Sequence, residues 1–144
     1  MAWIATEHTK KITTNMTPSF NRILAVLGVS ALLIVTPVSA SGCYSGGETW
    51  SQVATNAEIF DVMDSVCDSF AGTFSSGQTK SVCSSFSSGN SVNWAVTNDQ
   101  GDSQTLIASD CVSAMTIEIN ACSHGSLQQH GDFYYQDDPN AGSC

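Results

Sequence analysis

The chain has 144 residues, with 4 Lys or Arg against 13 Asp or Glu and a formal net charge of −9. After residue 40 the imbalance is larger, because Lys80 is the only Lys or Arg against twelve carboxylates, a net charge of −11. Such a surface repels phosphate backbones and anionic lipid headgroups, so we expect neither nucleic-acid binding nor attachment to a membrane by basic residues.

A hydrophobic leader precedes the acidic part. Residues 23–35 form an uncharged run of 13 residues, shorter than the roughly 20 needed to cross a bilayer. Small residues at 38–40 suit cleavage by signal peptidase after the last of them. We therefore expect residues 1–40 to be a signal peptide, with Met16 as an alternative start. Residues 41–144 are then a single secreted domain that does not insert into a membrane, and a signal anchor is the alternative interpretation of the run.

The first predicted helix runs from Thr49 to Phe70 and stops before Gly72. Apolar side chains recur in it every three or four positions, and polar ones occupy the other face. A stripe this wide predicts a face buried in the core, with Trp50 packed there and not exposed for sugar stacking. The stripe consists of Trp50, Val53, Ala57, Phe60, Met63, Val66, Cys67 and Phe70.

Alternation of apolar and polar residues replaces the helical pattern after Gly77. Residues 79–84 and 92–97 predict two antiparallel strands, joined by a loop at 87–91. Trp94 lies between two valines on the apolar side, so we expect it to be buried. Residues 98–102 have the composition of a turn.

A second helix is predicted to run to about Ala121, with Ser109 or Asp110 as its N-cap. Cys111 and Cys122 are eleven residues apart, about 16 Å along a continuous helix. A disulfide requires Cα atoms within roughly 7 Å, so these two cannot pair with each other. The even number of cysteines predicts three disulfides, with the connectivity otherwise open. The six are Cys43, Cys67, Cys83, Cys111, Cys122 and Cys144.

The tail predicts a short final strand at Phe133–Tyr135, followed by a turn at 138–140 containing Asp, Pro and Asn. Within the strand, Tyr134 faces the opposite way from its two neighbours. The elements together predict an α+β domain in which two helices pack on a small antiparallel sheet, stabilised by disulfides.

The order of these motifs resembles a family of small secreted fungal proteins. The motifs are C…W…helix…C, a strand cysteine, SDC at a helix start, EINACSHG, and the tail GDFYYQDDPNAGSC. The best-known type in that family is a mushroom protein that recognises LacdiNAc-containing sugars. The resemblance covers nearly all of residues 41–144 and is strongest from Cys122 onward. It implies an αβα-type sandwich with intrachain disulfides, and glycans or glycoproteins as partners, without assigning the residues that touch sugar.

A sugar site needs an aromatic face and a few planar polar groups on a rigid surface, and the tail holds such residues. The alternative is that the tail packs on the core with its carboxylates solvated. The candidate ligand-binding residues are His130, Tyr134, Asp137, Asp138 and Asn140.

Other functions have weaker support in the sequence. His124 and His130 could serve as acid and base in a ribonuclease, but Lys80 is the only candidate to stabilise the transition state. A metal site from these histidines and Asp132 has uneven spacing, so we expect no metal and no cofactor. A second fungal family of secreted effectors, akin to killer toxins, shares the size and cysteine content, although such toxins are often basic. An effector acting on a host protein is therefore the alternative to a lectin-like domain.

Overall fold

The computed structural model describes residues 42–144, so the predicted signal peptide at 1–40 lies outside the described part. The described residues form an α+β domain, as the sequence predicts, and none of their helices has both the length and the apolar character of a membrane span. In chain order the elements are α1 (Trp50–Val53), α2 (Asn56–Phe70), β1 (Gly72–Phe74), β2 (Thr79–Ser85), β3 (Ser91–Asn98), β4 (Gln104–Leu106), α3 (Ala108–Ala121), β5 (Ser126–His130) and β6 (Phe133–Asn140).

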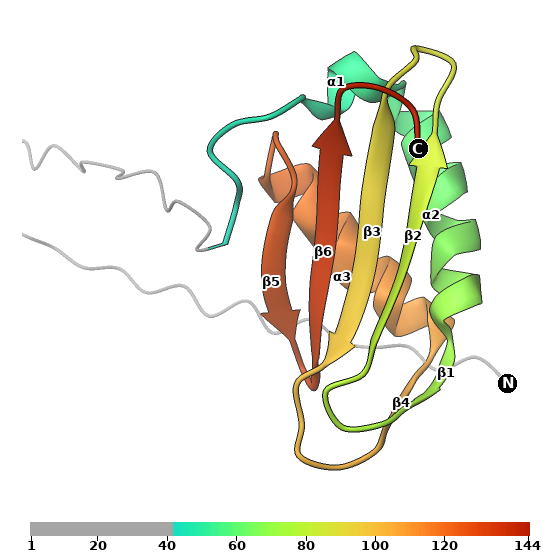
Figure 1. Cartoon of the computed structure of the whole chain (residues 1–144), viewed down its shortest axis with the longest axis vertical. Helices are drawn as coiled ribbons and strands as arrows, with labels where there is room; N and C mark the ends of the chain where they lie inside the picture. The colour runs from blue at the N-terminus through green and yellow to red at the C-terminus, as the bar shows by residue number, and fades with distance from the viewer. Residues whose placement is uncertain (1–41) are drawn as a thin grey trace, which may run out of the picture. The chain divides into compact units, whose positions relative to one another are not determined.

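The central feature is a four-stranded antiparallel sheet in the order β2-β3-β6-β5, beside a small pair formed by β1 and β4. Figure 1 views this sheet from its uncovered side, with α2 and α3 behind it. Both long helices lie on one face, so the expected αβα-type arrangement takes the form of two layers. One face of the sheet is therefore left open.

The first predicted helix is divided in two. Ala54 adopts an extended conformation, and Thr55 begins a second helix as its N-cap. The Thr55 hydroxyl accepts a hydrogen bond from the backbone N–H of Glu58, whose carboxylate accepts one in return from the Thr55 N–H at 3.0 Å. This capping box is a strong start signal, and a continuous helix would lose it. The break changes which side chains are buried. Ile59 lies in the core, whereas Ala57, which the sequence pattern placed there, is exposed.

The core lies between the helices and the inner face of the sheet. Trp94 is fully buried, as predicted, and its ring stacks on that of Trp50 with 6.0 Å between centroids. The indole N–H of Trp50 donates to the Cys122 carbonyl at 2.8 Å, so this polar group is paired although it is buried. Both tryptophans therefore serve the core.

The predicted turn at 138–140 is wrong, because β6 continues through these residues to Asn140. A proline inside a sheet is tolerated only where its nitrogen has no partner strand. β6 pairs with β5 only as far as Asp137, and the Pro139 ring lies against Gly125 beyond the end of β5. The strand β5 and the short pair β1 and β4 have no counterpart among the predicted elements.

Three disulfides join Cys43 to Cys122, Cys67 to Cys111, and Cys83 to Cys144. The exclusion of a Cys111–Cys122 bond is confirmed, and no cysteine of residues 42–144 is free. The Cys67–Cys111 bond joins α2 to α3, while the Cys83–Cys144 bond holds the C-terminal residue against β2. Cys43 pairs through its backbone with Ser126 at the start of β5, next to its own disulfide. The disulfides thus connect the two long helices, attach Cys144 to the edge strand β2, and attach the segment around Cys43 to the residue that follows α3.

Candidate functional site

The sheet separates the five candidate residues into two groups. Along β6, exposure alternates from residue to residue, with Phe133, Tyr135 and Asp137 buried. Tyr134, Asp138 and Asn140 therefore face away from the helices, as predicted for Tyr134. Asp137 points inward, and His130 is paired with Phe133 and shares its inner face. The candidates thus occupy two different sites.

The outward group belongs to the open face of the sheet. The continuous register between the four strands places the same face of each strand side by side. A shallow depression of about 350 Å³ lies in this face, with Ser81, Asn93, Ala95 and Gln136 among its lining residues. The side chains of the open face are Thr79, Ser81, Cys83 and Ser85 from β2, Ser91, Asn93, Ala95 and Thr97 from β3, Tyr134, Gln136, Asp138 and Asn140 from β6, and Leu127 and Gln129 from β5.

Hydroxyl and amide groups dominate the open face. Its only charged side chain is that of Asp138. The Thr79 and Thr97 hydroxyls hydrogen-bond to each other at 2.7 Å across β2 and β3. Lys80 lies on the other face, where its ammonium donates to the carbonyls of Phe70 and Ala71. The open face is therefore a nearly neutral polar surface on an otherwise acidic molecule.

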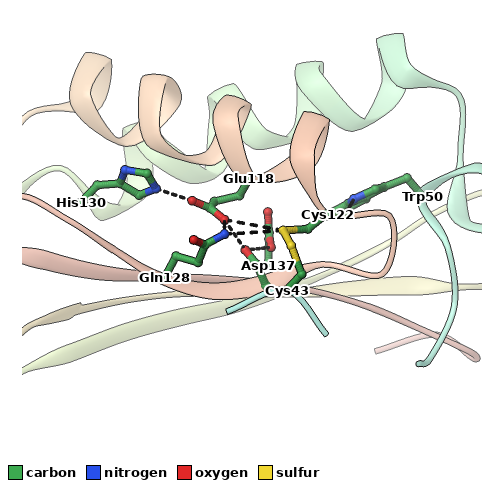
Figure 2. Close-up of a disulfide and its surroundings, with 8 residues drawn as sticks. Cys43, Trp50, Glu118, Cys122, Gln128, His130 and Asp137 are labelled. Carbon is green, nitrogen blue, oxygen red and sulfur yellow. Dashed lines mark hydrogen bonds and ion pairs between the residues drawn. A yellow bond between two sulfur atoms is a disulfide. The ribbon is translucent and has the colours of Figure 1, made fainter. Parts of the chain in front are cut away.

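The inward group belongs to a polar cluster beneath α3, which comprises Glu118, Ser126, Gln128, His130 and Asp137. Glu118, in the last turn of α3, is only 1% exposed. Figure 2 shows its side chain pointing from α3 toward the sheet, between His130 on one side and the Cys43–Cys122 disulfide on the other. The carboxylate accepts hydrogen bonds from Gln128 Nε2, from His130 Nε2 and, at 2.8 Å, from the Ser126 hydroxyl. A buried charge is costly unless it is paired in this way.

One proton in this cluster must sit on a carboxyl group. Ser126 Oγ lies 2.8 Å from both Glu118 Oε2 and Asp137 Oδ1, but a hydroxyl has a single proton to donate. The second contact therefore requires a protonated carboxyl group that donates to Ser126. Burial raises the pKa of Asp137 to about 8; hydrogen bonding of Ser126 to the ionised carboxylate opposes this shift, and the negative charge of Glu118 adds to it. We therefore assign the proton to Asp137, which donates to Ser126, which in turn donates to Glu118.

The two tail histidines lie at opposite ends of β5. His130 is the last residue of this strand, whereas His124 precedes it and bonds through Nδ1 to the Gly47 carbonyl at 3.0 Å. The five residues of β5 alone span roughly 13 Å from the first to the last, and His124 lies two residues before the strand. Such a separation prevents the pair from acting as acid and base on one phosphodiester, and it also separates two of the three ligands considered for a metal. Among residues 42–144, no group of three potential ligands is close enough together to hold a metal ion.

Glu118, Ser126 and Gln128 are absent from the sequence-based candidates. A signal for Glu118 was present, because it lies three residues after Met115 and seven after Cys111, both on the predicted apolar face. A carboxylate at a core position of a helix predicts a buried polar partner. The partner Ser126 could not be found in this way, because β5 itself was not predicted.

Comparisons with families and with curated proteins found no match. No model of a known protein family matches the chain, and no curated protein is similar to it at the level required for a match. The resemblance to fungal glycan-binding proteins thus has no support outside the motifs themselves.

Proposed function

We propose that this protein is a secreted carbohydrate-binding protein, which holds a neutral glycan on the open face of its sheet. Export is supported by the hydrophobic leader and by three disulfides, which form and persist in oxidising compartments. The resemblance of the tail to a fungal lectin family points in the same direction.

The observation that carries the proposal is the depression in the open face. Sugar hydroxyls both donate and accept hydrogen bonds, so a sugar site needs side chains that can do the same. Asn93 and Gln136 provide amides within the depression, Ser81 provides a hydroxyl, and the small side chain of Ala95 leaves room above the sheet. These side chains stand on adjacent strands and need little ordering when a ligand binds.

Tyr134 supplies an aromatic group on the same face of β6 as Gln136. It is two positions from Gln136 and directly opposite Thr97 on β3. Its ring is half-buried and would stack against the C–H face of a pyranose at the margin of the depression. The net charge of −11 disfavours sialylated or uronic acid-containing glycans, because they would be repelled.

A glycan array with the purified protein tests the proposal. We expect selective binding to neutral glycans, and Asn93→Ala and Gln136→Ala should each lower the affinity about tenfold. Asn120→Ala is the matched control, since Asn120 is an exposed asparagine on α3, in the helix layer. A uniformly negative array would contradict glycan binding, and equal losses in all three variants would contradict the location.

A further inference from the structure

A second concavity, of about 380 Å³, lies on the helix side of the sheet. It is bounded by β4, the first half of α3 and the turn that joins β5 to β6. Its apolar lining includes Leu106, Ile117 and Phe133. We call it the Tyr135 pocket, after the residue that carries the inference. It shares only β6 with the depression in the open face and lies on the opposite face of the sheet, so the proposed glycan site does not use it.

Tyr135 lines this pocket, and its hydroxyl has no partner among the described residues. The residue is only 2% exposed, yet its hydroxyl makes no hydrogen bond within residues 42–144. The small accessible part of the residue includes this hydroxyl oxygen, because Asp137 Oδ2 is the only fully buried side-chain polar atom of residues 42–144 without a partner. Burial, together with the negative charge of Asp110, raises the pKa of Tyr135 to about 12, so the group is an uncharged hydroxyl at neutral pH. It can thus accept a hydrogen bond from a ligand.

Two carboxylates of the pocket lack a cation. Asp110 and Asp132 both line the pocket, and neither forms an ion pair in the described part of the chain. Lys80 cannot supply the missing charge, because its ammonium is held by two backbone carbonyls and lies 4.3 Å from the centroid of the Phe74 ring. His130 also borders the pocket, but its Nε2 is committed to Glu118.

We propose that the Tyr135 pocket binds an organic ammonium group carried on an apolar stem. The ammonium has three donors, which match the two carboxylates and the tyrosine hydroxyl. The stem lies on the apolar lining and removes it from water. A pocket of this volume is at the lower limit for small-molecule sites, which suits a small amine. Two sources present the same chemistry: a free alkylamine and a lysine side chain of another polypeptide.

An NMR titration of the isotope-labelled protein tests the proposal with three probes of equal length: hexylamine, hexanol and hexanoate. Hexylamine should cause saturable shifts at the backbone amides around the pocket, and the other two should not. Asp110→Asn should weaken hexylamine binding about tenfold, since it removes a charge-assisted hydrogen bond. Tyr135→Phe should weaken it about fivefold, because it removes one neutral hydrogen bond and keeps the buried ring.

Asp64→Asn provides the control, as it removes the same charge from an exposed position on α2. Unchanged binding in this variant, with losses in the other two, would support the pocket. Equal shifts with hexylamine and hexanol, or equal losses for Asp110→Asn and Asp64→Asn, would overturn the proposal. Nα-acetyl-lysine methylamide separates the sources: binding as tight as that of hexylamine indicates a polypeptide lysine, and weaker binding indicates a free amine.

Discussion

The two halves of the domain are built alike, but they bury different chemistry. Each half contributes a helix and an antiparallel hairpin, α2 with β2 and β3 in the first, and α3 with β5 and β6 in the second. Beneath α2 the buried side chains are apolar, as in Met63 and Phe70. Beneath α3 the core includes Glu118 and Asp137, each 1% exposed.

This difference means that the halves are stabilised in different ways. Burial of apolar surface stabilises the first half with no dependence on protonation. In the second half, two carboxyl groups share one serine hydroxyl, and this arrangement is favourable only while one of them keeps its proton. The stability of the second half should therefore fall as the pH rises toward 8, whereas the buried apolar side chains of the first half add no such dependence.

The largest effect on the free energy of unfolding is expected from removing the disulfide between the halves. The Cys67–Cys111 disulfide is the covalent link between α2 and α3, and it closes a segment of 44 residues. Replacing both cysteines by alanine should lower the free energy of unfolding by about 4 kcal/mol, because the unfolded chain gains freedom. Urea denaturation of the oxidised proteins measures the change. A loss below about 1 kcal/mol would mean that packing alone holds the halves together.

The next effect is the pH dependence of stability that the proton on Asp137 causes. The pKa of Asp137 is about 8 in the folded protein, against 3.8 for an ordinary aspartate exposed to water. The folded state therefore binds more protons than the unfolded state between these values, so its stability is greatest at acidic pH and falls as the pH rises toward 8. Between pH 5 and 8 this single group should cost on the order of 3–4 kcal/mol.

Asp137→Asn should remove this pH dependence. An asparagine amide can donate to Ser126 as the protonated acid does, so the variant should be close to the parent at pH 5 and more stable than it at pH 8. Asp138→Asn is the matched control, since the adjacent side chain faces the open face, and it should leave the slope unchanged. Parallel stability curves for the parent and Asp137→Asn would show that Asp137 is ionised throughout.

A third test concerns the tight approach between β6 and the chain before β5. Gly125 has φ +80°, and a Cβ there would lie 2.0 Å from the Asp137 carbonyl oxygen. Gly125→Ala should destabilise the protein by about 3 kcal/mol, from both strain and clash. Gly89 has φ +88° but open space around it, so Gly89→Ala should cost only about 1 kcal/mol. Similar losses in both variants would mean that the backbone moves to relieve the clash.

The sequence predicted the features that depend on neighbouring residues and missed those that depend on distant ones. The apolar stripe of α2 and the alternation of β3 are local patterns, and both predicted elements are present. The turn assigned to Pro139 failed, because whether a proline fits a strand depends on the neighbouring chain, and Gly125 supplies that space from a distant position. The candidate site was divided for the same reason. Asp137 and Asp138 are neighbours in sequence, but once they lie in a strand they face opposite sides.

The smallest effect is expected on the open face, where stability and binding should separate. Asn93 is exposed and faces away from the core, so Asn93→Ala should change the free energy of unfolding by less than about 0.5 kcal/mol. Met63→Ala, which empties a buried position beneath α2, should cost about 2–5 kcal/mol in the same urea measurement. Side chains on such a face are not needed for folding, so they are available to bind a ligand. If Asn93→Ala instead destabilised the fold by more than about 1 kcal/mol, the amide would have a structural role, and a loss of glycan affinity in that variant could not be attributed to a lost contact.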